Sequence, residues 1–258
     1  MDNIEHLTRR NFIQKAAILS AAGTVIATMA KSADVTMNEN EVENYTFLFQ
    51  GDSITDGNRS RNVDWNHVLG HGYAYLIAAR LWYEFPKKGF HFFNRGISGN
   101  TVGDLLKRWN EDTIAIKPDL LSILIGINDT MKAVNGDLDF TVAKFEHDYR
   151  ALLIETRSQL PGLQLVICEP FILPVGHVKE KWAEYDQAVR PRQEIAKKLA
   201  LEFNAIFVPL QAVFEKAVEE NPPADFWLWD GIHPMPNGHE LFARTWIKDV
   251  SKKLKFIR

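Results

Sequence analysis

Short apolar runs alternate with longer amphipathic segments from residue 45 to the C-terminus, a pattern that predicts an α/β fold. The run at residues 120–125 is almost wholly apolar, as is typical of a central parallel strand buried on both faces. The predicted strands are residues 45–50, 90–94, 120–125, 163–168 and 205–208. The predicted helices are residues 73–85, 102–116, 141–160, 181–203 and 238–254, the fourth with an interruption near Pro191.

Strict alternation of strand and helix predicts a five-stranded parallel sheet with helices on both faces. Ligands of such sheets bind at the carboxyl ends of the strands. Polar or flexible residues follow three of the predicted strands: Ser53 the first, Gly96 the second and Asn128 the third. Asp230 and His233 lie in the loop before the last helix. We therefore expect these five residues to gather on one rim of the sheet.

The N-terminus has the pattern of an export signal. Arg9 and Arg10 precede an apolar, alanine-rich run at residues 16–30, which is too short to span a bilayer comfortably. A first amphipathic helix of the fold is the alternative, but the run has no polar stripe. We predict a twin-arginine-type signal peptide at residues 1–30, a polar linker at 31–44 and one domain at 45–258, in a bacterial protein that is periplasmic or secreted.

Charge and cysteine content narrow the function classes. The net charge is −3, without a basic patch interleaved with aromatic residues, which argues against nucleic acid as a partner. The single cysteine, Cys168, rules out a disulfide framework and a cysteine-based metal cluster. His67 and His71 have a spacing that would suit a metal pair, but no carboxylate motif accompanies them. We predict no metal, no cofactor and no membrane insertion after signal cleavage; the oligomeric state, a homo-oligomer included, stays open.

Asp230 stands three residues before His233, close enough for the carboxylate to hold one ring nitrogen and leave the other free. A lone serine after a strand, such as Ser53, is most often a helix N-cap. A capping serine does not need an Asp–His pair on the same rim. The combination predicts Ser53 as a nucleophile, His233 as its general base and Asp230 as the residue that orients the base.

Acyl transfer also needs hydrogen-bond donors for the oxyanion. The candidates are the backbone N–H of Ser53, the backbone N–H of Gly96 and the side-chain amide of Asn128. A turn glycine and a turn asparagine are the structural alternatives for the last two. Asp52 is expected to brace the turn that presents Ser53, and Asp129 to do the same for Asn128.

Four sequence blocks together resemble the SGNH (GDSL) hydrolase family. They are Gly51-Asp52-Ser53, Gly96, Gly126-x-Asn128-Asp129 and Asp230-x-x-His233-Pro234. The resemblance implies a three-layer, flavodoxin-like fold and a metal-free serine esterase. Thr55 stands where the Gly-x-Ser-x-Gly elbow of α/β-hydrolases has its second glycine.

A narrower resemblance, to bacterial GDSL carbohydrate esterases and notably acetylxylan esterases, extends over residues 51–56, 96–105 and 125–129. It implies hydrolysis of O-acetyl esters on xylan or its oligosaccharides through an acyl-enzyme. A lysophospholipase or thioesterase of the same family is the alternative, and a non-catalytic carbohydrate-binding protein is a further one.

Aromatic residues and histidines near these blocks are candidates for the substrate pocket, because aromatic faces suit sugar rings. Core packing is the alternative, and for Trp229 it has at least equal weight. The predicted substrate-binding residues are Trp65, His71, Tyr73 and Trp227.

Overall fold

The computed structural model describes residues 42–62, 66–220 and 222–258. The predicted signal peptide and almost all of the predicted linker therefore lie outside the described residues. The described chain contains a five-stranded sheet, which confirms the predicted α/β class. The strands are β1 (Thr46–Gly51), β2 (His91–Asn94), β3 (Leu120–Leu124), β4 (Gln164–Cys168) and β5 (Ile206–Val208).

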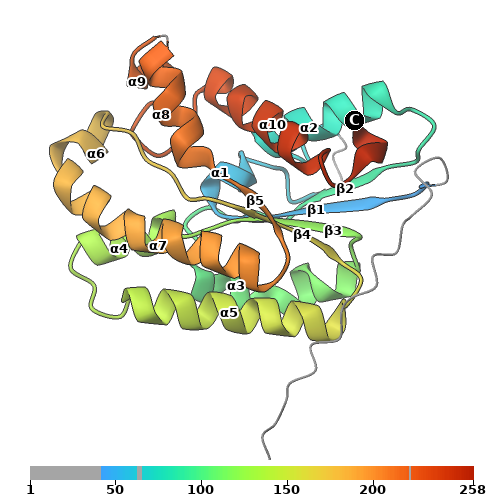
Figure 1. Ribbon diagram of the computed structural model, residues 1–258, viewed down its shortest axis with the longest axis horizontal. Coiled ribbons are helices and arrows are strands. Elements are labelled where there is room, and N and C mark those ends of the chain that lie inside the picture. The colour runs from blue at the N-terminus through green and yellow to red at the C-terminus, as the bar shows by residue number, and fades with distance from the viewer. Residues whose placement is uncertain (1–41, 63–65, 221) are drawn as a thin grey trace, which may run out of the picture. The chain divides into compact units, whose positions relative to one another are not determined.

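All strand pairs are parallel, and the order across the sheet is β2-β1-β3-β4-β5 (Figure 1). In β3, the strand expected to be central, every residue is buried. Each predicted strand agrees with an observed one to within a residue at either end, because the apolar runs are short and sharply bounded. The carboxyl ends of β1, β2 and β3 meet at one edge, where the predicted site residues follow.

Helices cover both faces of the sheet, as predicted (Figure 1). Alternation within β1 separates the two cores: Phe47 and Phe49 pack with one helical layer, and Leu48 packs with the other. The first layer contains α2 (Tyr73–Glu84), α8 (Leu210–Glu220) and α10 (Pro236–Val250). The second contains α3 (Val102–Asp112), α5 (Val142–Gln159) and α7 (Trp182–Glu202).

Helix α7 corrects one prediction, because it passes through Pro191 without a break. Proline removes the N–H that would bond the carbonyl of Gln187 four residues earlier. Gln187 is exposed, so water can take the place of the missing donor. The Arg192 guanidinium donates to the Ala188 carbonyl at 2.7 Å and supports the same turn.

Short helices and the limits of longer ones differ from the predictions. The helix expected at residues 102–116 ends at Asp112, and a 3₁₀ turn, η1 (Ile114–Ile116), follows it. Helix α8 was not predicted, and α10 begins at Pro236, a residue type favoured in the first turn.

No described helix is long and apolar enough to cross a membrane. The remaining elements are α1 (Ser53–Asp56), α4 (Ile127–Val134), α6 (Gly176–Glu180), α9 (Ala224–Trp227) and η2 (Lys255–Ile257).

Candidate active site

Ser53 is the first residue of α1, a single helical turn that is separated from the end of β1 by one residue, Asp52. Asp52 is the N-cap, and its Oδ1 accepts the Ile54 N–H at 3.1 Å. The cap is a common device for starting a helix, because it satisfies a donor that has no partner inside the helix. Asp52 thus braces the turn that holds Ser53 at the rim.

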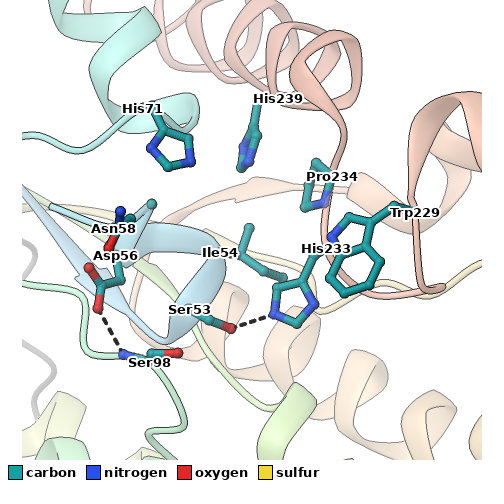
Figure 2. A pocket seen from close by; sticks show the side chains of 11 residues that line it. Ser53, Ile54, Asp56, Asn58, His71, Ser98, Trp229, His233, Pro234 and His239 are labelled. Atoms are coloured by element: carbon teal, nitrogen blue, oxygen red, sulfur yellow. Dashed lines mark hydrogen bonds between the residues drawn. The ribbon is translucent and has the colours of Figure 1, made fainter. Parts of the chain in front are cut away.

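Ser53, His233 and Asp230 form a continuous chain of hydrogen bonds. The Oγ of Ser53 lies 2.8 Å from Nε2 of His233, and Figure 2 shows the serine directed at the ring. Nδ1 of His233 lies 2.7 Å from Oδ2 of Asp230. Residues 180 positions apart in the chain are therefore in the arrangement of a nucleophile, a base and an orienting acid.

The carboxylate of Asp230 is held by more than the imidazole. Its Oδ1 accepts the backbone N–H groups of Ile232 at 2.9 Å and His233 at 2.7 Å. Burial by itself raises the pKa of Asp230, but the hydrogen bonds from the His233 ring and from the two N–H groups outweigh it and lower that pKa. The hydrogen bond to Asp230 raises the pKa of His233, and the nearby charge of Asp52 adds to the rise.

Two further carboxylates lie beneath the site. Asp52 is fully buried; burial raises its pKa to about 7, and its Oδ2 has no hydrogen-bond partner among the described residues. Asp129 is also buried, which raises its pKa to about 6. It was expected to brace Asn128, but its carboxylate instead accepts the Val102 N–H, at 3.3–3.4 Å, at the start of α3.

The three predicted oxyanion donors differ in their present partners. The Ser53 N–H has no acceptor among the described residues. The amide of Asn128, in the first turn of α4, gives one of its two hydrogens to the carbonyl of Asn100 at 3.0 Å. The N–H of Gly96 donates to Oδ1 of Asn94 at 2.9 Å, so it already has an acceptor. The oxyanion role of all three residues stays a prediction.

Gly96 has a packing reason to be glycine. A Cβ at this position would lie 2.4 Å from the backbone nitrogen of Asp56 in α1. The preceding Asn94 holds the same turn, because its Nδ2 donates to the Thr55 carbonyl at 2.6 Å and to the Leu69 carbonyl at 2.9 Å. Asn94 was missed in the sequence, where its only signal is a polar residue that ends an aromatic strand.

A cavity of about 290 Å³ opens beside Ser53 and His233 (Figure 2). Trp229 is 61% exposed and stacks on the His233 ring, with centroids 5.8 Å apart. The core-packing reading of Trp229 is therefore wrong. The lining is mostly polar and consists of Ser53, Ile54, Asp56, Gly57, Asn58, His71, Ser98, Trp229, His233, Pro234 and His239.

The predicted substrate-binding residues divide between this cavity and other places. His71 lines the cavity. Tyr73 does not, because its side chain is fully buried, with its hydroxyl 2.9 Å from Oγ1 of Thr55. Trp227 is partly buried, packs against the core and is not among the lining residues. Trp65 lies outside the described residues.

Candidate metal ligands do not cluster in the described part of the chain. No group of three or more His, Cys, Asp and Glu residues there is arranged to hold a metal ion. The one described cysteine, Cys168, is buried.

Comparison with known proteins relates most of the chain to one family. The model of the GDSL-like Lipase/Acylhydrolase family matches residues 49–241. An acetylxylan esterase from Geobacillus stearothermophilus is 36% identical over 211 residues, which cover 79% of this chain and 92% of that protein.

Solved structures agree with that relation. A protein described as a GDSL-like lipase, from Parabacteroides merdae, has a TM-score of 0.75 at 40% identity, covering 81% of this chain and 96% of its own. Axe2, an acetylxylan esterase from Geobacillus stearothermophilus, has a TM-score of 0.68 at 34% identity, covering 81% of this chain and 95% of its own. Structures described as catalytic mutants of Axe2 replace a serine, an aspartate and a histidine with alanine.

Proposed function

Because the chain belongs to the GDSL-like lipase/acylhydrolase family, we propose that it is a serine esterase that removes acetyl or other short acyl groups from O-acylated carbohydrate. The observation that carries the proposal is the hydrogen-bonded chain from Ser53 through His233 to Asp230, at 2.8 and 2.7 Å, on the wall of a polar cavity. An intact nucleophile, base and acid argue against a non-catalytic carbohydrate-binding protein.

In the first half of the reaction, Oγ of Ser53 attacks the acyl carbonyl carbon while Nε2 of His233 takes its proton. The carbonyl oxygen becomes an oxyanion, for which the Ser53 N–H and the free hydrogen of the Asn128 amide are donors. The intermediate breaks down when His233 returns the proton to the sugar oxygen, which leaves as a hydroxyl group. The acyl group remains on Ser53 as an ester.

In the second half, water attacks the acyl-enzyme, and His233 takes a proton from that water. Collapse of the second tetrahedral intermediate releases the carboxylic acid and returns the proton to Ser53 Oγ. Throughout, Asp230 keeps the imidazole in one tautomer and stabilises the imidazolium that forms in each half.

Two observations support a carbohydrate substrate. The relative from Geobacillus stearothermophilus is described as an acetylxylan esterase. In this chain the cavity beside Ser53 is lined mainly by polar side chains. The exposed indole of Trp229 also lines it and stacks on the His233 ring. Hydroxyl-rich sugar rings are complementary to such a surface, and aromatic faces stack on them, whereas a lysophospholipid requires a long apolar groove.

The test measures acetate release from acetylated xylan, pectin and glucomannan, with a lysophospholipid and a thioester as the alternatives. We expect an acetylated polysaccharide or its oligosaccharides to be preferred; preference for the lipid or the thioester would replace the carbohydrate proposal. Ser53→Ala should lower hydrolysis of p-nitrophenyl acetate by at least ~10³-fold, and retained activity would remove Ser53 as nucleophile.

We also propose that the protein is exported through the twin-arginine route. The support is sequence alone: Arg9 and Arg10 before the apolar run at residues 16–30. Replacing both arginines with lysine should hold the protein inside a bacterial host that carries this pathway. Unchanged export of the double variant would argue for another route.

A further inference from the structure

His239 lies in the first turns of α10 and forms part of the cavity wall. Figure 2 shows its ring beside that of His71, across the cavity from Ser53 and His233. The residue is only 8% exposed, so the surface it retains is the part that lines the cavity. It has no part in the hydrolysis steps described above, although it shares the cavity with the residues that carry them out.

Helix α2 sets the orientation of the His239 ring. The backbone N–H of Tyr73, the first residue of α2, donates to Nδ1 of His239 at 3.2 Å. Gly72 allows the ring to approach this closely, because a Cβ there would lie 3.1 Å from Cε1 of His239. The ring is thus held between the starts of two helices.

This contact determines which nitrogen carries the hydrogen. Since Nδ1 accepts a hydrogen bond, the hydrogen of the neutral ring is on Nε2. Burial, with smaller effects from His71 and His233, lowers the pKa of His239 to about 4, so the ring is neutral near pH 7. Nε2 makes no hydrogen bond with the described residues. The ring therefore offers the cavity one neutral, oriented donor.

The chemistry of an O-acyl sugar indicates which substrate atoms can accept a hydrogen bond from Nε2–H of His239. The acyl carbonyl oxygen is the acceptor for the oxyanion donors, and an acetyl methyl group accepts no hydrogen bond. The sugar carries hydroxyl and ring oxygens that do accept. A neutral donor also suits the site, because a cationic ring here would oppose the imidazolium that His233 becomes during the reaction.

Building on the carbohydrate esterase function proposed above, we propose that His239 is a specificity-determining residue whose Nε2–H donates a hydrogen bond to an oxygen of the sugar part of the substrate. The cavity has room for that part. Its volume of about 290 Å³ is far above the ~10–15 Å³ that holds one water molecule, which leaves room beyond the acetyl group.

Two substitutions separate this role from the structural contact with Tyr73. His239→Asn keeps an acceptor near the position of Nδ1 and removes the Nε2 donor. His239→Gln keeps a donor near the position of Nε2 and removes the acceptor for the Tyr73 N–H. The matched control is His147→Asn, which makes the same change on α5, in the helical layer on the other face of the sheet.

The measured quantity is the ratio of kcat/KM for an acetylated xylo-oligosaccharide to kcat/KM for p-nitrophenyl acetate, which has no sugar. His239→Asn should lower the ratio about three- to tenfold, the effect of one neutral hydrogen bond. His239→Gln should recover part of the ratio, although its melting temperature falls further because Tyr73 loses its acceptor. His147→Asn should leave the ratio unchanged.

Each other result has a defined meaning. If wild-type enzyme cleaves the oligosaccharide but His239→Asn has an unchanged ratio, His239 does not read the sugar, and the esterase function stands. A ratio that follows melting temperature across the variants would make the role structural and overturn the inference. If wild-type enzyme cleaves p-nitrophenyl acetate but no acetylated saccharide, the proposed substrate class and this inference fall together, while the Ser53 chemistry stands.

Discussion

The two carboxylate oxygens of Asp230 have separate partners, and this division explains how one buried side chain holds the His233 ring in place. One oxygen binds the His233 ring, and the other binds two backbone N–H groups of its own loop. The loop therefore fixes the carboxylate, and the carboxylate fixes the ring. The spacing of three residues makes both sets of contacts available to one side chain.

The pH dependence of catalysis follows from these contacts. In the proposed mechanism His233 acts as a base only when it is neutral. The hydrogen bond to Asp230 is the main cause that raises the pKa of His233. We expect kcat/KM for p-nitrophenyl acetate to fall as pH drops through this raised pKa. Asp230→Asn should move that fall to lower pH, because the carboxylate no longer favours the imidazolium, and should lower kcat by ~10³–10⁴. A pH–rate profile of both proteins checks this, and an unmoved acid limb would assign it to another group.

Asp52 gives a prediction about stability. Burial raises its pKa from 3.8 to about 7 in the folded protein. Between about pH 4 and 7 the native state then holds a proton that the unfolded chain has released, so stability falls as pH rises. Asp52→Asn keeps the cap on Ile54 and removes the ionisation. Its free energy of unfolding relative to wild type should therefore rise by roughly 3 kcal/mol between these pH values.

Urea unfolding at pH 4.5 and at pH 7.5 measures this difference. An Asp225→Asn variant is the control, because Asp225 lies in an exposed part of α9. A difference between Asp52→Asn and wild type that is the same at both pH values would mean that Asp52 is ionised in the native state throughout this range.

Among the elements, the single turn of α1 depends on its neighbours for its stability. Four residues are too few to be stable as an isolated helix. The turn is held at its start by the Asp52 cap and at its end by Asn94, which binds the Thr55 carbonyl. The loop after β2 packs directly on it at Gly96. The position of Ser53 therefore depends on an element that only tertiary contacts maintain.

Gly96→Ala tests this dependence. The added Cβ would lie 2.4 Å from the Asp56 nitrogen, so α1 or the loop must move. We expect a loss of about 1–3 kcal/mol in the free energy of unfolding and a fall in kcat, because Ser53 is displaced with α1. Gly162→Ala is the matched control, since nothing lies within 4 Å of its Cβ position. Wild-type stability and kcat in Gly96→Ala would show that the turn adjusts freely.

For the domain as a whole, all described site residues lie in one compact unit. Its N-terminal edge is anchored by Tyr45, which is buried and packs on Phe47 and on Phe256 near the C-terminus. Tyr45 thus connects Phe47 of β1 with Phe256 of η2 through aromatic contacts.

This anchoring predicts different effects for two truncations. Removal of residues 1–36 should leave the melting temperature and kcat/KM for p-nitrophenyl acetate close to those of the full chain. Removal of residues 1–45 should lower the melting temperature clearly, because it also deletes the aromatic contacts of Tyr45. Thermal unfolding of both proteins compares them, and equal stability would mean that Tyr45 contributes little to the core.

The sequence by itself determined the order and approximate limits of the five strands, because short apolar runs between polar breaks have few other interpretations. It also determined the pairing of Asp230 with His233, since a spacing of three residues suffices for that contact. It indicated Ser53 as the hydrogen-bond partner of His233, because the end of β1 and the loop before the last helix lie at one rim of the sheet. Local pattern was enough wherever the relevant contact is local or lies at the end of a strand.

Only the tertiary structure decided which residues face the cavity. Trp229 and Trp227 stand two residues apart, yet one is exposed beside His233 and the other packs on the core. Tyr73 is predicted to line the pocket, but its side chain is buried. His239, 166 positions away, accepts a hydrogen bond from the Tyr73 N–H and lines the cavity instead. Whether Tyr73 or His239 lies at the cavity depends on how α2 and α10 pack together. The pattern of apolar residues within either helix does not predict that packing.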